Sequence, residues 1–195
     1  MLDFPLLLHY KRFRFDDDEF YDFCVQNDQL KFERDNQGNI SIMPNTGGKT
    51  GRLNLKLAQQ IANWNDKYGL GEAFDSSTAF RLPNTAVRSP DIAWVVSDRW
   101  NGLTESEQEK FPPICPDFVI ELMSATDTET ESKKKMETEW LPNGCQLGWL
   151  INPFEQKTYI YRPAQAVQEI VGFDQKLSGE AVLPHFELDL SLLMK

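Results

Sequence analysis

The strongest fold signal in the chain is the segment from Phe118 to Ile151, which reads FVIELMSATDTETESKKKMETEWLPNGCQLGWLI. Its first six residues are apolar apart from one acid, as is typical of a strand that is buried on both faces. A helix is predicted from Thr126-Asp127 to about Leu141, and a second apolar strand begins at Leu147. A strand, a helix and a strand in succession predict a right-handed parallel crossover, and therefore an α/β fold.

The rest of the chain predicts a mixed sheet flanked by helices. The further elements are indicated by three kinds of signal: acid-rich helix starts, apolar residues at helical or alternating spacing, and glycine-containing turns. No repeat or linker divides the chain, so we expect a single α/β domain with an N-terminal helix and hairpin, residues 1–43, before a core over 44–195. The elements predicted before the crossover are a short helix at 16–27, a hairpin turning at 35–38, an amphipathic helix over 53–64 that stops at Gly69, and a pair of strands at 72–80 and 87–96.

The composition is that of an acidic globular domain. The chain has 195 residues, of which 41% are hydrophobic, and this length buries a core without disulfides or a structural metal. Its three cysteines show no CxxC spacing, and the apolar stretch near the start is far shorter than a signal-peptide core, so we expect a cytoplasmic protein without a membrane span. With 20 basic and 30 acidic residues the net charge is -10, which works against an extended phosphate-binding surface but permits a divalent cation held by clustered carboxylates.

Two acids stand out because they lie in or beside apolar strands. Glu121 lies inside the first apolar run, where an ionised carboxylate is costly unless it is paired, protonated or bound to a metal. Asp91 directly precedes the apolar run 92–96, at the entrance of another strand. Carboxylates on neighbouring strands can converge on a magnesium ion. The alternatives are that Asp91 is a turn residue that accepts backbone hydrogen bonds and that Glu121 pairs with Arg81 or Arg88.

Three consecutive lysines, Lys133, Lys134 and Lys135, lie on the helix predicted to follow Glu121. In a crossover this helix runs back antiparallel to the strand. A lysine about 12 Å along the helix axis can therefore return to the level of Glu121. Lys133 shares the apolar face of the helix better than Lys135 does, so the choice among the three stays open. The alternative is that all three form a solvated face.

Six stretches of the sequence form a set with a characteristic order and spacing. They are MPNTGG at 43–48, FDSST at 74–78, RSPD at 88–91, DFVIELMS at 117–124, GWLINP at 148–153, and the ending from Leu177 to Leu193. Together they resemble the Uma family, a family of restriction-endonuclease-like proteins that is abundant in cyanobacteria. The resemblance runs from about Asp16 over nearly the whole chain. It implies a restriction-endonuclease-like mixed sheet and membership of the PD-(D/E)XK nuclease superfamily.

The resemblance implies roles for several of these residues. The superfamily pattern places its two acids at Asp91 and Glu121, which implies that both bind a magnesium or manganese ion, with the Leu122 carbonyl as a further ligand. The superfamily lysine normally lies two residues after the second acid, where this chain has Met123. The spacing in the Uma family points instead to Lys135 as the catalytic lysine.

Two departures from the family pattern bear on this assignment. The stretch from Lys135 to Asn143-Gly144 is one residue longer than usual, so Lys133 and Lys134 stay open as the active-site lysine. Lys49 stands where relatives often carry a glutamate after the paired glycines. If that glutamate assists metal binding elsewhere, this chain has lost a ligand.

The resemblance and the charged residues together predict a magnesium-dependent endonuclease that hydrolyses DNA phosphodiester bonds. A homodimer is implied by the superfamily habit of cutting two strands. One alternative is a catalytically silent member that serves as a binding or regulatory module, and the acidic composition counts toward it. The other is a metal-dependent hydrolase of a small phosphate ester.

Overall fold

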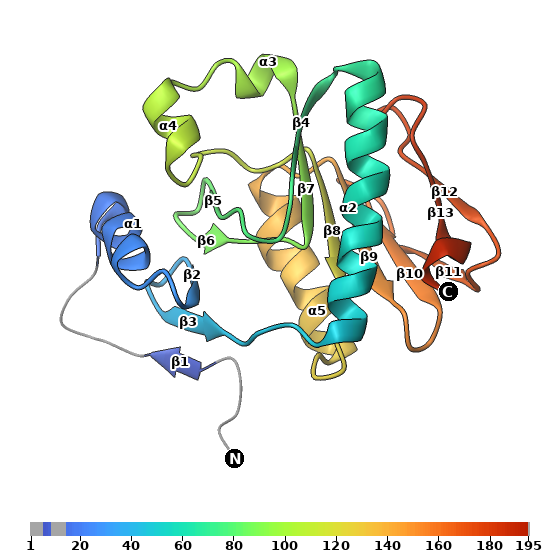
Figure 1. Ribbon diagram of the computed structural model, residues 1–195, viewed down its shortest axis with the longest axis horizontal. Coiled ribbons are helices and arrows are strands. Elements are labelled where there is room, and N and C mark those ends of the chain that lie inside the picture. Colours follow the sequence, from blue (N-terminus) through green and yellow to red (C-terminus); the bar gives the residue numbers. More distant parts are fainter. Residues whose placement is uncertain (1–5, 9–14, 195) are drawn as a thin grey trace.

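The computed structural model describes residues 6–8 and 15–194, and Figure 1 shows how their helices and strands are arranged. The helices are α1 (Asp17–Gln26), α2 (Gly48–Tyr68), α3 (Ser97–Trp100), α4 (Glu105–Glu109) and α5 (Glu129–Lys135), followed by a π-helical turn (Met136–Trp140) and short 3-10 turns at Leu141–Asn143 and Leu190–Leu193. The strands are β1 (Leu6–Leu8), β2 (Lys31–Arg34), β3 (Ile40–Met43), β4 (Gly71–Phe74), β5 (Phe80–Arg81), β6 (Val87–Arg88), β7 (Ile92–Val96), β8 (Phe118–Leu122), β9 (Leu147–Asn152), β10 (Lys157–Tyr161), β11 (Gln168–Val171), β12 (Lys176–Ser178) and β13 (Glu187–Asp189).

A six-stranded mixed sheet is the largest sheet of the protein. Its strand order is β11-β10-β9-β8-β7-β4. The β8–β9 pair is parallel, and the other four pairs are antiparallel. Because α5 and the turns after it connect the parallel pair, the predicted strand–helix–strand crossover is confirmed. The α/β class with a mixed sheet flanked by helices is confirmed with it.

Both faces of this sheet are buried, because alternate residues of its central strands enter two different clusters. On β7, Ile92 and Trp94 pack with α2 and with the C-terminal strands, whereas Ala93 and Val95 pack on the opposite face with Trp140. Figure 1 shows α2 crossing the sheet on the side away from α5. Within the described residues, no helix has the length and apolar character needed to cross a membrane.

The second sheet joins the N-terminal hairpin to strands from the core. Its order is β1-β3-β2-β6-β5, and α1 packs on it through Phe20 (Figure 1). The prediction of one strand pair over 72–80 and 87–96 is therefore wrong in detail. β4 pairs with β7 in the large sheet, whereas β5 pairs with β6 in the small one. The turn that begins at Asp75 separates β4 from β5, and Pro90 separates β6 from β7. Each predicted strand is therefore divided between the two sheets.

The crossover helix differs from its predicted form at both ends. The side chain of Thr128, rather than Thr126 or Asp127, caps α5 by accepting the Glu131 N–H. Asp127 instead accepts the Ser124 N–H in the preceding turn. At the other end, the predicted helix ends as an α-helix at Lys135 and continues through the π-helical and 3-10 turns. Gly144 ends it with a φ of 114°, a left-handed value.

One glycine is required by the close approach of two strands. A Cβ at Gly71 would lie 2.1 Å from the Val95 carbonyl oxygen and 2.6 Å from ring carbons of Trp94, which is buried. Since neither atom can move freely, we expect Gly71→Ala to lower the free energy of unfolding by about 2 to 3 kcal/mol in urea denaturation. Gly51→Ala on α2 is the control, because its Cβ would meet nothing within 4 Å and alanine favours helix by about 0.5–1 kcal/mol. Equal unfolding midpoints for the two variants would contradict the close approach.

Candidate active site

Asp91 and Glu121 meet at the ends of two neighbouring strands. β7 and β8 are antiparallel with Ile92 opposite Ile120, so the preceding Asp91 lies beside Glu121. One oxygen of the Asp91 carboxylate, Oδ2, accepts the N–H of Leu122 at 2.8 Å. The adjacency that the sequence spacing left unproven is therefore present in the structure.

The Asp91 carboxylate is also held from the opposite side by α2. Asn54 Nδ2 donates to Asp91 Oδ1 at 2.7 Å. The other amide atom of Asn54, Oδ1, is buried and has no hydrogen-bond partner among the described residues. Sequence analysis missed Asn54. The available signal was a polar residue directly beside Leu53, the first core residue of an amphipathic helix.

Lys135 is the lysine that reaches the acids. Its Nζ lies 2.9 Å from Glu121 Oε1 and 3.5 Å from Glu33 Oε1. Lys133 is used elsewhere, because its Nζ lies 2.7 Å from Glu129 and 3.8 Å from the centre of the Tyr159 ring. Lys134 is exposed. The structure thus brings one of the three candidate lysines to Glu121.

The π-helical turn explains why helical periodicity favoured Lys133. Trp140 Nε1 donates to Glu121 Oε1 at 2.7 Å, so Trp140 and Lys135, five positions apart, contact the same oxygen. In a regular α-helix, positions five apart are about 140° apart around the axis. Here the Leu141 N–H donates to the carbonyl of Met136, five residues earlier, and this wider turn brings both side chains to one face.

The arginines proposed as partners of Glu121 pair with other acids. Arg88 donates to Glu33 at 3.2 Å and to Glu139 at 3.0 Å, and Arg81 pairs with Asp17. The interpretation of Glu121 as one half of a buried arginine pair is therefore wrong. Its cationic partner is a lysine from the crossover helix, which the local sequence around β8 does not reveal.

Burial and neighbouring charges set the electrostatics of the site. Burial raises the pKa of Glu121 to about 7 and outweighs the opposing effect of Lys135, while Asp91 and Glu33 add to the increase. Burial also raises the pKa of Asp91, against the hydrogen bonds from Leu122 and Asn54. Burial alone would lower the pKa of Lys135, but Glu121 and Glu33 raise it, so this lysine is charged. The acids outnumber the cation that they share.

The oxygens of this site suit a hard divalent cation. Both interactions described for the Glu121 side chain end on Oε1, which leaves Oε2 to face another ligand. Asp91 lies beside it, and the unpartnered Asn54 Oδ1 adds an amide oxygen to the same region. Among the described residues no three His, Cys, Asp or Glu side chains converge as a metal cluster. Two carboxylates with main-chain and water oxygens would therefore complete the coordination, as magnesium commonly accepts.

Lys49, which stands where relatives often carry a glutamate, lies at the start of α2. Lys49 is exposed in the first turn of that helix. It lies one turn and more before Asn54, the α2 residue that contacts Asp91. The polar contact from α2 to the site is thus made by an amide rather than by a carboxylate.

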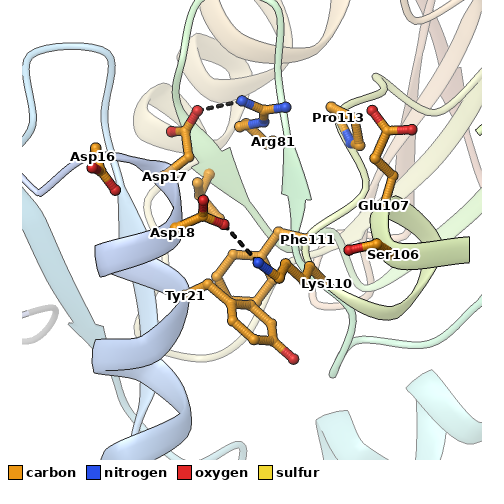
Figure 2. A pocket seen from close by; sticks show the side chains of 11 residues that line it. Asp16, Asp17, Asp18, Tyr21, Arg81, Ser106, Glu107, Lys110, Phe111 and Pro113 are labelled. Atoms are coloured by element: carbon orange, nitrogen blue, oxygen red, sulfur yellow. Dashed lines mark hydrogen bonds and ion pairs between the residues drawn. The ribbon is translucent and has the colours of Figure 1, made fainter. Parts of the chain in front are cut away.

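A separate hollow of about 480 Å³ lies between α1 and the α4 region, as Figure 2 shows. Both of its cationic side chains are paired with acids that also line it, since Asp17 pairs with Arg81 and Lys110 Nζ lies 2.7 Å from Asp18. Asp91, Glu121 and Lys135 are absent from its lining residues. This hollow is therefore distinct from the candidate active site.

Comparisons with known proteins bear on the fold and the family. The model of the Uma2 family, described as "Putative restriction endonuclease", matches residues 17–191. A crystal structure of "a putative nuclease belonging to DUF820" from Anabaena variabilis is similar, with a TM-score of 0.72 and 24% sequence identity. The similarity covers 85% of this chain and 90% of that chain, and it shows a shared fold. No curated protein matches this chain.

Proposed function

The chain belongs to the Uma2 family, and from this premise we propose that it is a magnesium- or manganese-dependent endonuclease that hydrolyses DNA phosphodiester bonds. The description of the family and the name of the similar crystal structure both refer to nucleases. The single observation that carries the proposal is the meeting of Asp91, Glu121 and Lys135. These residues come from a loop, a strand and a helix. Lys135 Nζ lies 2.9 Å from Glu121, and Asp91 accepts the N–H of Leu122, the residue after Glu121.

In this proposal the two acids bind the metal ion and the lysine acts on the water or the phosphate. Asp91 and Glu121 would bind the ion, and the Leu122 carbonyl is proposed as a further ligand. When bound, the ion lowers the pKa of a coordinated water and stabilises charge that develops on the phosphate. The charged Lys135 ammonium, beside Glu121, orients the attacking water or stabilises the same phosphate charge.

Three main-chain and side-chain donors keep the acids oriented. The Leu122 N–H and Asn54 fix the two oxygens of Asp91, and the Trp140 indole fixes one oxygen of Glu121. Each carboxylate therefore has a fixed direction before substrate arrives. Such preorganisation accelerates a reaction, because the catalytic groups need not reorient as the transition state forms.

The partners and location in this proposal rest on the sequence and the resemblance. We propose a homodimer because two strands of DNA must be cut. We propose a cytoplasmic location because three scattered cysteines without CxxC spacing do not match the disulfide framework of a secreted protein. The net charge of -10 means that DNA affinity would depend on the local field of the site and the ion rather than on an extended basic surface.

The decisive experiment is nicking of supercoiled plasmid by the wild-type protein with magnesium or manganese. We expect nicking that EDTA abolishes and that Asp91→Asn lowers by more than about 10³-fold, because the variant loses a charged ligand of the ion. Asp98→Asn, which changes an exposed acid on α3, is the control and should cut like wild type.

Two results would overturn the proposal. If the wild type neither cuts DNA nor binds manganese in calorimetry, the catalytically silent module becomes the better description. If it binds manganese and cleaves a small phosphodiester such as bis-p-nitrophenyl phosphate, but shows no salt-dependent affinity for DNA, the substrate is a small ester instead.

A further inference from the structure

Glu33 brings a third acid to the candidate active site from the N-terminal hairpin. It lies on β2 and is only 4% exposed. Its Oε1 accepts the Ser89 N–H at 3.1 Å and faces Lys135 Nζ at 3.5 Å, and its Oε2 accepts from Arg88 at 3.2 Å. Every one of these partners is a donor, so Glu33 is bound as an ionised carboxylate rather than as a neutral acid.

The charge state of Glu33 agrees with these contacts. Burial alone would raise its pKa, but Lys135, Arg88 and the Ser89 N–H outweigh burial and lower it. Glu33 is therefore a negatively charged neighbour of Lys135. Lys135 Nζ thus has a second carboxylate beside it, at 3.5 Å, in addition to Glu121 at 2.9 Å.

Glu33 also fixes the crossover helix at a second point. Arg88, which binds Glu33, binds Glu139 at 3.0 Å through its other terminal nitrogen. Glu139 lies four residues after Lys135, in the π-helical turn. One carboxylate on β2 therefore restrains this part of the helix both directly at Lys135 and through Arg88 at Glu139.

The other acids of the site cannot take over this function. Glu121 and Asp91 lie at the ends of β8 and β7 and would be occupied by the ion under the proposed function. Once Glu121 binds a cation, its attraction for Lys135 weakens, because two positive charges then compete for one carboxylate. Glu33 is saturated by protein donors and keeps its hold on the lysine.

We propose that Glu33 is a positioning residue that holds Lys135 beside the metal-binding acids, so that the N-terminal hairpin is part of the active site. The inference deepens the proposed function and rests on it for the role of Lys135. The placement of Lys135 by Glu33 is a separate, structural claim. The two claims can therefore be tested apart.

The structural claim is tested by the rate at which each lysine is reductively methylated, resolved by fragment-ion mass spectrometry. In Glu33→Gln, which loses one of the two carboxylates beside Lys135, we expect methylation of Lys135 to be about threefold to tenfold faster than in wild type, with Lys133 unchanged. Glu129→Gln is the matched control, because it frees Lys133 on the same helix and should reverse the pattern. Equal Lys135 rates in wild type and Glu33→Gln would overturn the inference, whether or not the protein cuts DNA.

The kinetic arm uses plasmid nicking at saturating manganese. We expect Glu33→Gln to lower kcat about 10- to 100-fold with little change in KM or in manganese affinity by calorimetry, as for partners that orient active-site groups. On a Lys135→Ala background the same substitution should cost no further activity, because the lysine that it positions is gone. A full additional loss there would show a general structural role and contradict the inference.

The substitution is designed to leave the fold intact. The ion pairs of this region join three acids, Glu33, Glu121 and Glu139, to two cations, so replacing one acid by its amide removes an existing excess of negative charge. Should Glu33→Gln fail to fold, Glu33→Asp keeps the charge and withdraws it by one methylene. It is then expected to give the same faster methylation of Lys135, and an unchanged rate would overturn the inference.

Discussion

Glu121→Gln is expected to abolish metal-dependent cleavage while making the metal-free protein more stable. Glutamine keeps the oxygen that accepts the Trp140 indole N–H but removes the charge that would bind the ion. We therefore expect a loss of more than about 10³-fold in plasmid nicking and no manganese binding in calorimetry. We expect the free energy of unfolding to increase, because the charge of Glu121 is needed to bind the ion and destabilises the metal-free fold.

The sign of the stability change follows from the pKa of Glu121. Burial raises this pKa from 4.5 to about 7, so between these values the folded protein binds more protons than the unfolded chain. Stability then falls as pH rises through this window, and above pH 7 the ionised Glu121 costs about 2 to 4 kcal/mol relative to its neutral form. Glutamine resembles the neutral form, so the variant should exceed wild type by about this amount at pH 8 and match it near pH 4.

The comparison is made by urea denaturation in EDTA at both pH values. Glu137→Gln is the control, since it neutralises an exposed acid of the same π-helical turn and should leave both activity and stability nearly unchanged. A Glu121→Gln protein that is less stable than wild type at pH 8 would show that the carboxylate is a structural partner of Lys135. A variant that retains wild-type nicking would remove Glu121 from the catalytic proposal.

Glu121 and Asp91 could be predicted from the sequence because each lies in or directly beside an apolar run. Glu121 interrupts β8, and Asp91 stands at the entrance of β7, so local hydrophobicity alone singles them out. The antiparallel register of the two strands then places them side by side. The crossover was predictable for the same reason, since two apolar runs flank one helix-length segment.

The remaining contacts depend on geometry that no local pattern encodes. Lys135 and Trp140 share one oxygen of Glu121 because of a π-helical turn, whereas the 3.6-residue period favours Lys133. Glu33 lies in a short strand whose alternation resembles any hairpin, and its contact with Lys135 spans 102 positions. Such long-range pairing is fixed by how the second sheet docks against the crossover helix, which requires the fold.

Lys135→Met is expected to cause the largest loss of stability among the charged residues of the site. The lysine side chain is 25% exposed and lies between Glu121 and Glu33, whose side chains are 13% and 6% exposed. Methionine fills a similar volume but leaves two nearly buried carboxylates facing each other without their shared cation. Removing one partner of a buried pair costs about 3–5 kcal/mol, and we expect about 3 kcal/mol at pH 8 because of the partial exposure.

This loss should shrink as the pH falls, which separates it from a packing defect. Without the lysine, the pKa of Glu121 loses the largest effect that opposes burial and rises above its present value of about 7, so the acid becomes neutral in the folded variant on acidification. Urea denaturation in EDTA at pH 8 and pH 5 should show a deficit that is clearly smaller at pH 5, whereas Lys134→Met, which changes the exposed neighbour, should match wild type at both.

Adding Glu121→Gln to Lys135→Met should restore most of the stability at pH 8 and none of the nicking, because the unpaired charge is removed together with the groups that cut. A deficit that is equal at the two pH values would mean that Lys135 contributes packing rather than charge, and the ion pair with Glu121 would lose its energetic role.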